Sequence, residues 1–156
     1  MANVKLTELA AITTTDDATD VVAVVDVSAD ATKKITVANL VSAQARTYTA
    51  AQRGEITTLT DGANISVDLA ASNNFSATLA GNRTLDNPSN IVAGQSGSIF
   101  IVQDGTGSRT LAYGSYYDFA GGTAPTLTTD ASAVDRIDYL VRSATSIHCV
   151  FTANYS

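Results

Sequence analysis

Gly97-Ser-Ile-Phe-Ile-Val-Gln103 decides the fold class, because it is the clearest β-strand in the sequence. Its β-branched and aromatic side chains favour an extended backbone. Asp104-Gly-Thr-Gly107 follows as a hairpin loop, and Arg109-Thr-Leu-Ala-Tyr113 is the returning strand. These glycines do not indicate a phosphate-binding loop, since neither a Lys-Ser/Thr pair nor a helix follows them.

Shorter strands lie on both sides of this pair. Asn64-Ile-Ser-Val-Asp-Leu69 places Ile65, Val67 and Leu69 on one face, and Phe75-Ser-Ala-Thr-Leu79 repeats the alternation. Asp61-Gly62 is a strong turn signal. Two late strands are expected at 137–142 and 145–152. Strands that recur every 8–12 residues or so between Gly, Asn and Asp turns are typical of a β-sandwich or barrel.

The chain is therefore predicted to be mainly β and to have three regions. Residues 55–156 are predicted to form an antiparallel β-sandwich or jelly-roll-like domain, and residues 47–54 a connector. Residues 1–46 are predicted to form a separate N-terminal region, for which the resemblance described below implies an anchoring or assembly role. Within it, Val21–Val27 and Lys33–Val37 predict a β-hairpin, and Ala38–Arg46 predicts a short helix.

Composition narrows the function classes. The chain has 156 residues, 45% of them hydrophobic and only 15% charged, with a net charge of −6. A typical soluble domain has about 25% charged residues. An acidic chain without a basic face is a poor nucleic-acid binder, because phosphate contacts need clustered Lys and Arg. No apolar run approaches the length of a membrane span or the core of a signal peptide, so we expect no membrane span and no export signal.

Catalytic motifs are not found in the sequence. His148 is the only histidine and Cys149 the only cysteine, and as neighbours on a strand they point to opposite faces, so they cannot act as a nucleophile–base pair. The Gly-x-Ser-x-Gly elbow of the α/β-hydrolases does not occur. The acidic residues near Asp16 lack the spacing of an EF-hand. Glu8 and Glu55 are the only glutamates, which gives little support to polysaccharide cleavage. We predict no enzyme activity, no catalytic residues, no metal and no cofactor.

An aromatic cluster in a Gly-rich loop is the most distinctive local feature. It consists of Tyr113, Tyr116, Tyr117 and Phe119. Tyrosine in such loops is typical of recognition surfaces, because it supplies a large contact area at a low entropy cost. Two interpretations stay open: an exposed loop that contacts a ligand or another subunit, and rings that cap one end of the domain.

Several segments of the sequence together resemble a module of tailed-bacteriophage virion proteins. Similar modules are found in tail fibres, tail appendages and small head-surface proteins. The segments are Gly81-Asn-Arg-Thr-Leu85, Pro88, Ala93-Gly-Gln-Ser-Gly97, Gln103-Asp-Gly-Thr-Gly-Ser-Arg-Thr-Leu111 and Ala120-Gly-Gly-Thr-Ala-Pro125. The segments Lys5–Leu9, Val21–Val27 and Thr32–Val37 also resemble the start of many phage appendage proteins, where this part serves as the attachment piece.

The resemblance implies a virion-surface protein, commonly a homotrimer, made in the bacterial host cytoplasm. Its partners would be the major capsid protein or tail proteins, with a host surface glycan as a further possible ligand. The short chain favours a capsid decoration (cement) protein or short head fibre, and the alternative is a receptor-binding tail fibre or appendage. The residues expected to anchor it or to pack between subunits are Leu6, Leu9, Ile12, Val22, Val24 and Val25.

Overall fold

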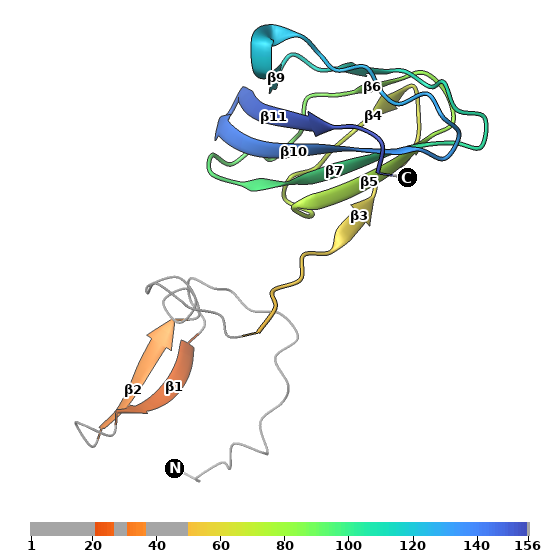
Figure 1. The fold of residues 1–156 in the computed structure, drawn as a ribbon. Coiled ribbons are helices and arrows are strands. Elements are labelled where there is room, and N and C mark those ends of the chain that lie inside the picture. Colours follow the sequence, from red (N-terminus) through yellow and green to blue (C-terminus); the bar gives the residue numbers. More distant parts are fainter. Residues whose placement is uncertain (1–20, 27–30, 37–49, 156) are drawn as a thin grey trace. The chain divides into compact units, whose positions relative to one another are not determined.

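The computed structural model describes residues 21–26, 31–36 and 50–155 (Figure 1). The chain divides into two compact units, Met1–Ala51 and Gln52–Ser156. In the first unit, β1 (Val21–Asp26) pairs with β2 (Ala31–Thr36) in antiparallel register. The helix expected at 38–46 lies outside the described residues.

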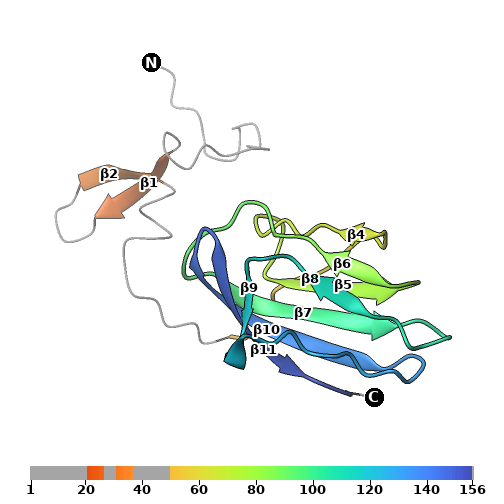
Figure 2. The ribbon, with the colours of Figure 1, turned by 90° about the horizontal axis from the view of Figure 1, so that it is seen from above.

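The second unit contains a six-stranded sheet and a three-stranded sheet (Figure 2). The strand order of the larger sheet is β3 (Ile56–Thr58), β5 (Asn74–Leu79), β7 (Ser96–Gln103), β10 (Val134–Ser143), β11 (Ser146–Thr152) and β9 (Tyr117–Phe119). The smaller sheet has the order β4 (Asn64–Ile65), β6 (Arg83–Leu85) and β8 (Leu111–Tyr113). A short 3-10 turn, η2 (Ala120–Gly122), follows β9.

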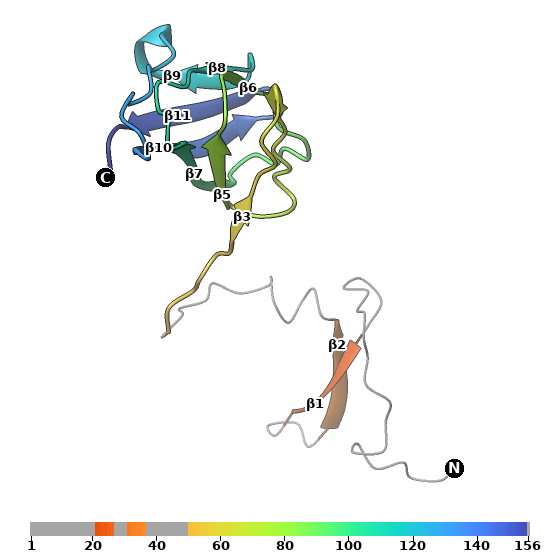
Figure 3. The ribbon, with the colours of Figure 1, turned by 90° about the vertical axis from the view of Figure 1, so that its right-hand side faces the viewer.

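The first six strands of this unit build three stacked coils. The chain alternates between the two sheets, so β3 and β4 form the first coil, β5 and β6 the second, and β7 and β8 the third. Neighbouring coils pair in parallel in both sheets. A third line of parallel contacts joins the first two coils, where Leu69 N donates to Ser89 O at 3.1 Å and Ser89 N donates to Val67 O at 2.9 Å. Figure 3 shows the strands of the two sheets in cross-section.

The mainly β prediction is confirmed, but the antiparallel arrangement is wrong, because both sheets contain parallel pairs. The hairpin predicted around Asp104–Gly107 is wrong as well, since β7 and β8 lie in different sheets. The Gln103 side chain explains the crossing: its Oε1 accepts from Arg109 N at 2.8 Å and its Nε2 donates to Arg109 O at 2.9 Å. The Gln103 side chain thus bonds the backbone groups of Arg109 that a neighbouring strand would bond in a hairpin. The chain then passes on to the other sheet.

A hairpin follows the coils. β10 and β11 pair in antiparallel register, and β10 also runs antiparallel to β7. Both late strands are thus present as predicted, except that β10 begins already at Val134. β9 pairs in parallel with β11 at the outer edge. The hairpin therefore extends the larger sheet beyond the third coil.

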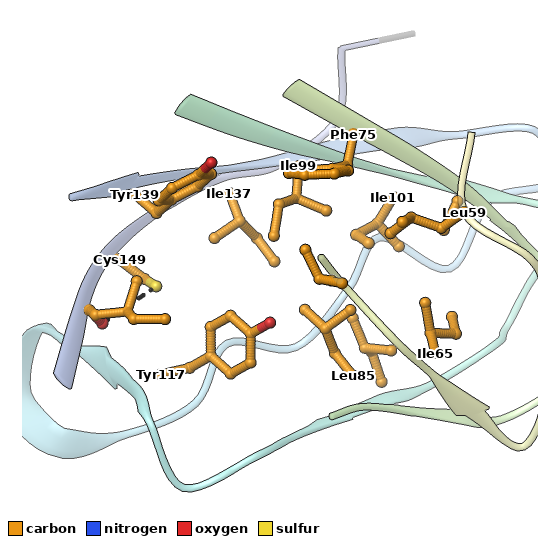
Figure 4. Close-up of a cluster of buried hydrophobic side chains, with 14 of the residues drawn as sticks. Leu59, Ile65, Phe75, Leu85, Ile99, Ile101, Tyr117, Ile137, Tyr139 and Cys149 are labelled. Atoms are coloured by element: carbon orange, nitrogen blue, oxygen red, sulfur yellow. Dashed lines mark hydrogen bonds between the residues drawn. The ribbon is translucent and has the colours of Figure 1, made fainter. Parts of the chain in front are cut away.

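The core lies between the two sheets (Figure 4). Ile65, Val67 and Leu69 are all buried, which confirms the predicted common face. Phe75 and Leu79 of β5 are fully buried. Complete burial of such a side chain contributes about 1.5–3 kcal/mol. The larger sheet thus has one buried face, and its other side carries the remaining alternate residues.

Candidate functional site

The predicted anchoring residues fall in the first unit. Leu6, Leu9 and Ile12 lie outside the described residues. Val22, Val24 and Val25 are in β1, where their backbone pairs with β2. Their anchoring role stays a prediction.

The aromatic cluster lies where the third coil ends. Tyr113 is the last residue of β8, whereas Tyr117 and Phe119 are in β9, so the predicted loop contains a strand. The Tyr113 ring meets the Phe119 ring at a centroid distance of 4.8 Å and the Tyr117 ring at 6.1 Å, both edge to face. Such pairs contribute about 0.5–1.5 kcal/mol beyond their buried area. The cluster thus joins β8 of the smaller sheet to β9 of the larger one.

Tyr117 is a core residue rather than part of an exposed loop. Its side chain is 7% exposed, and its hydroxyl donates to Asp86 O at 3.2 Å. Burial raises the pKa of the Tyr117 phenol. The prediction of an exposed position is therefore wrong for Tyr117, because this side chain is the inward-pointing residue of β9. Tyr113, Tyr116 and Phe119 are half-buried and pack against the core.

A hollow of about 430 Å³ opens beside these rings. The side chains of Tyr113, Tyr117 and Phe119 line it, together with the polar groups of Ser115 and Asp118. Asp118 is exposed, and its carboxylate accepts a hydrogen bond from the Ser146 hydroxyl at 2.6 Å. Aromatic walls with a carboxylate and a hydroxyl at the rim can hold a small ligand by ring contact and hydrogen bonds. The hollow therefore places ring faces beside a carboxylate and a hydroxyl at this end of the unit.

Asn87 positions the segment that leads into β9, and the sequence reasoning missed it. Its Oδ1 accepts from Tyr116 N at 2.9 Å, and its Nδ2 donates to Ser115 Oγ at 3.2 Å. A Cβ at Gly114 would lie 2.3 Å from the same Oδ1, so this close approach requires glycine. Asn in a loop is a known backbone partner, but nothing in the sequence points to a partner so far along the chain.

His148 and Cys149 lie on opposite faces of β11, as predicted. His148 is exposed, whereas Cys149 is 5% exposed. Burial raises the pKa of the Cys149 thiol to about 12, which keeps it protonated at neutral pH. These two side chains therefore do not form a nucleophile–base pair with each other.

Within residues 21–26, 31–36 and 50–155, no group of three or more His, Cys, Asp or Glu side chains is arranged to hold a metal ion. No helix in this part of the chain is long and apolar enough to cross a bilayer. Comparison of the chain with protein-family models, with curated proteins and with solved structures found no match.

Proposed function

We propose that this chain is a non-enzymatic structural protein of a tailed-phage virion. In this proposal it acts as a trimeric capsid decoration (cement) protein or short head fibre on the shell exterior. The observation that carries the proposal is the resemblance of the segments between Gly81 and Pro125 to phage virion modules. The division of the chain into a smaller N-terminal unit and a larger β unit agrees with an attachment piece followed by an outward-facing head.

The larger unit would act as a sandwich-like head domain whose two layers are the six-stranded and three-stranded sheets. Cementing requires no bond-making chemistry. Many copies that bind the assembled shell and not its separated subunits stabilise the shell by mass action. A threefold arrangement gives each copy two contacts that close on themselves, so the oligomer does not grow into a fibre.

The number of copies per particle tests this proposal. Quantitative mass spectrometry of purified virions should give hundreds of copies for a shell decoration. A few copies, or a few tens, would instead favour a tail part. Complete absence from purified particles would overturn the virion proposal itself.

The second candidate is a tail appendage that binds a host surface glycan. The observation that favours it is the hollow lined by Tyr113, Phe119 and Asp118. Substitution of Asp118 and Phe119 by Ala should then lower phage adsorption while the particle stays stable to heating. Tyr155→Ala is the control, since this tyrosine is exposed and does not line the hollow. Unchanged adsorption of the double variant would rule out this role for the hollow.

A further inference from the structure

The stack of coils ends in open strand edges at the first coil. Beyond the third coil, the larger sheet continues through β10, β11 and β9. Among the described residues, no strand lies beyond β3 in the larger sheet or beyond β4 in the smaller one. This surface, the first-coil end, is formed by residues 56–69 and contains the outermost strand of each sheet.

The backbone of the first-coil end has unpaired hydrogen-bonding groups. Leu59 N donates to Ser76 O at 2.8 Å, and Ala63 O and Ile65 O accept from the second coil at 3.0 Å and 2.9 Å. Backbone groups of successive residues point to opposite sides of a parallel strand. The intervening residues therefore turn their N–H and C=O groups away from the stack, where no described residue bonds them. These are Thr58, Asn64 and Ser66.

A hollow of about 390 Å³ lies at this same end. The buried side chains of Leu59 and Phe75 contribute to its lining. Thr58, Asn64 and Ser66 also line it, and all three are exposed. The hollow thus combines apolar contact with the backbone groups that have no partner in the stack.

The edges of the first-coil end are not protected against pairing. Natural proteins often place Pro or Lys at an open edge to prevent pairing with another chain. Residues 56–69 contain no proline, lysine or arginine. β3 and β4 are short, but the bonding to the second coil continues at Leu59 and again at Val67 and Leu69. An extended polypeptide matches such an edge, because it supplies donors and acceptors alternately at the spacing of a strand.

The charge of the hollow restricts the partner further. Asp61 and Asp68 are the charged residues that line it. Asp61 forms an ion pair with Arg83 at 2.6 Å. The Asp68 carboxylate accepts from Asn90 Nδ2 at 2.7 Å and from Ala70 N at 2.9 Å, and both donors are neutral. The negative charge of Asp68 is therefore not compensated, and a Lys or Arg of the partner complements it.

We propose that the first-coil end binds an extended segment of a partner polypeptide by strand addition. The segment alternates apolar and polar residues, so that its apolar side chains pack over Leu59 and Phe75 while its backbone pairs with Thr58 or with Asn64 and Ser66. A basic side chain of the segment lies near Asp68. This binding does not depend on the trimer or on the virion role.

A titration of the ¹⁵N-labelled full chain, followed by NMR, tests the proposal. The probe is the synthetic peptide Ac-Thr-Val-Thr-Val-Lys-Val-NH2. It should cause saturable shifts of the backbone amide signals of Thr58, Asn64 or Ser66. The same peptide with every backbone amide N-methylated should cause none, because it has no N–H donors. Absence of saturable shifts with the first peptide, or equal shifts with both, would overturn the proposal.

Thr58→Pro removes an N–H that faces away from the stack. Proline is tolerated at such a position of an edge strand. The variant should stay folded in a thermal melt and bind the peptide about tenfold more weakly. Thr126→Pro is the matched control, since Thr126 is exposed and does not line this hollow, and it should bind like the wild type. A folded Thr58→Pro with unchanged affinity would contradict strand addition at β3.

Asp68→Asn keeps the hydrogen-bond acceptor for Ala70 and removes the charge. The wild type should bind the lysine peptide more tightly than a version with norleucine in place of lysine. Asp68→Asn should abolish this preference, and this readout does not depend on whether Thr58→Pro folds. A preference that persists in Asp68→Asn would show that the peptide lies elsewhere.

Discussion

The Asp135 carboxylate holds Thr128 by two hydrogen bonds, from the backbone N to Oδ2 and from the hydroxyl to Oδ1, both at 2.8 Å. Oδ1 also accepts from Asn154 N at 2.8 Å. On the next strand, Gln103 Nε2 donates to Thr128 O at 2.8 Å. Among the described residues, Gln103 and Asp135 are the two buried polar or charged side chains, 2% and 1% exposed. Together they fix the segment before β10 and the C-terminal residues to the larger sheet.

Asp135→Asn should lower the free energy of unfolding by about 1–3 kcal/mol. The amide nitrogen would replace one oxygen, so an N–H donor would face another donor in a buried site. Asp130→Asn is the control, since Asp130 is exposed and should change stability by less than about 0.5 kcal/mol. Urea unfolding of both variants measures the difference, and equal stabilities would contradict this role of Asp135.

Tyr113→Phe and Tyr139→Phe should differ in how they change the stability of the fold. The buried Tyr113 hydroxyl has no hydrogen-bond partner among the described residues, so its removal should be neutral or stabilising. The Tyr139 hydroxyl donates to Asn73 O at 3.0 Å, and its removal should cost about 1 kcal/mol. Thermal melts of the two variants give the comparison. A clear loss of stability in Tyr113→Phe would show that its hydroxyl has a partner.

Gly97→Ala should be strongly destabilising. A Cβ at Gly97 would lie 1.7 Å from Asn73 O, so the start of the second coil, next to β5, would have to move away from β7. We expect a loss of more than about 2 kcal/mol, comparable to severe overpacking. Gly105→Ala is the control, because a Cβ there meets nothing within 4 Å. Similar melting temperatures for both variants would contradict the close contact.

Acid should weaken the fold through two arginine–aspartate pairs. The hydrogen bond from Arg83 lowers the pKa of Asp61, and the one from Arg109 lowers the pKa of Asp104. A lowered pKa in the folded state gives stability that is present above the ordinary value of 3.8 and is lost as the pH falls through the folded value.

The double variant Asp61→Asn/Asp104→Asn tests this pH dependence. Urea unfolding between about pH 5 and pH 2 should show a flatter slope for the variant than for the wild type. The change should be modest, because both pairs are partly exposed and screened by solvent. Identical slopes would mean that other carboxylates control the acid sensitivity.

The Cys149 thiol should be unreactive in the folded protein. Its pKa is raised to about 12 by burial, so very little thiolate exists at pH 8. A thiol-specific chromogenic reagent should react slowly with the native chain and rapidly after unfolding in urea. Rapid reaction of the native chain would show that β9 or β11 opens readily.

Strands were predictable where the signal is local. The alternation in Asn64–Leu69 and Phe75–Leu79 identified buried positions correctly, because a period of two depends only on neighbouring residues. Strand partners were not predictable. Asp-Gly turns occur both in hairpins and where a chain passes from one sheet to another. In the Asp104–Gly107 segment the outcome depends on the Gln103 side chain, which bonds to both backbone groups of Arg109.

The candidate site was identified in part. The aromatic residues were recognised from the sequence, but the hollow beside them was not predicted. The sequence left the burial of Tyr117 undecided, because β9 pairs with β11, which comes much later in the chain. Asn87 was missed for the same reason: its partners Ser115 and Tyr116 are distant in sequence. Contacts of this kind depend on the tertiary fold.

The stacked coils also suit a chain that leaves the ribosome from its N-terminus. The earlier partner of each new strand has already been synthesised, since β5 pairs with β3 and β7 pairs with β5. The nascent chain can therefore add one coil at a time to an existing template. The far edge of β7 must wait for β10 to emerge, and β9 must wait for β11. Until β10 has emerged, the exposed edge of β7 can pair wrongly with another newly made chain.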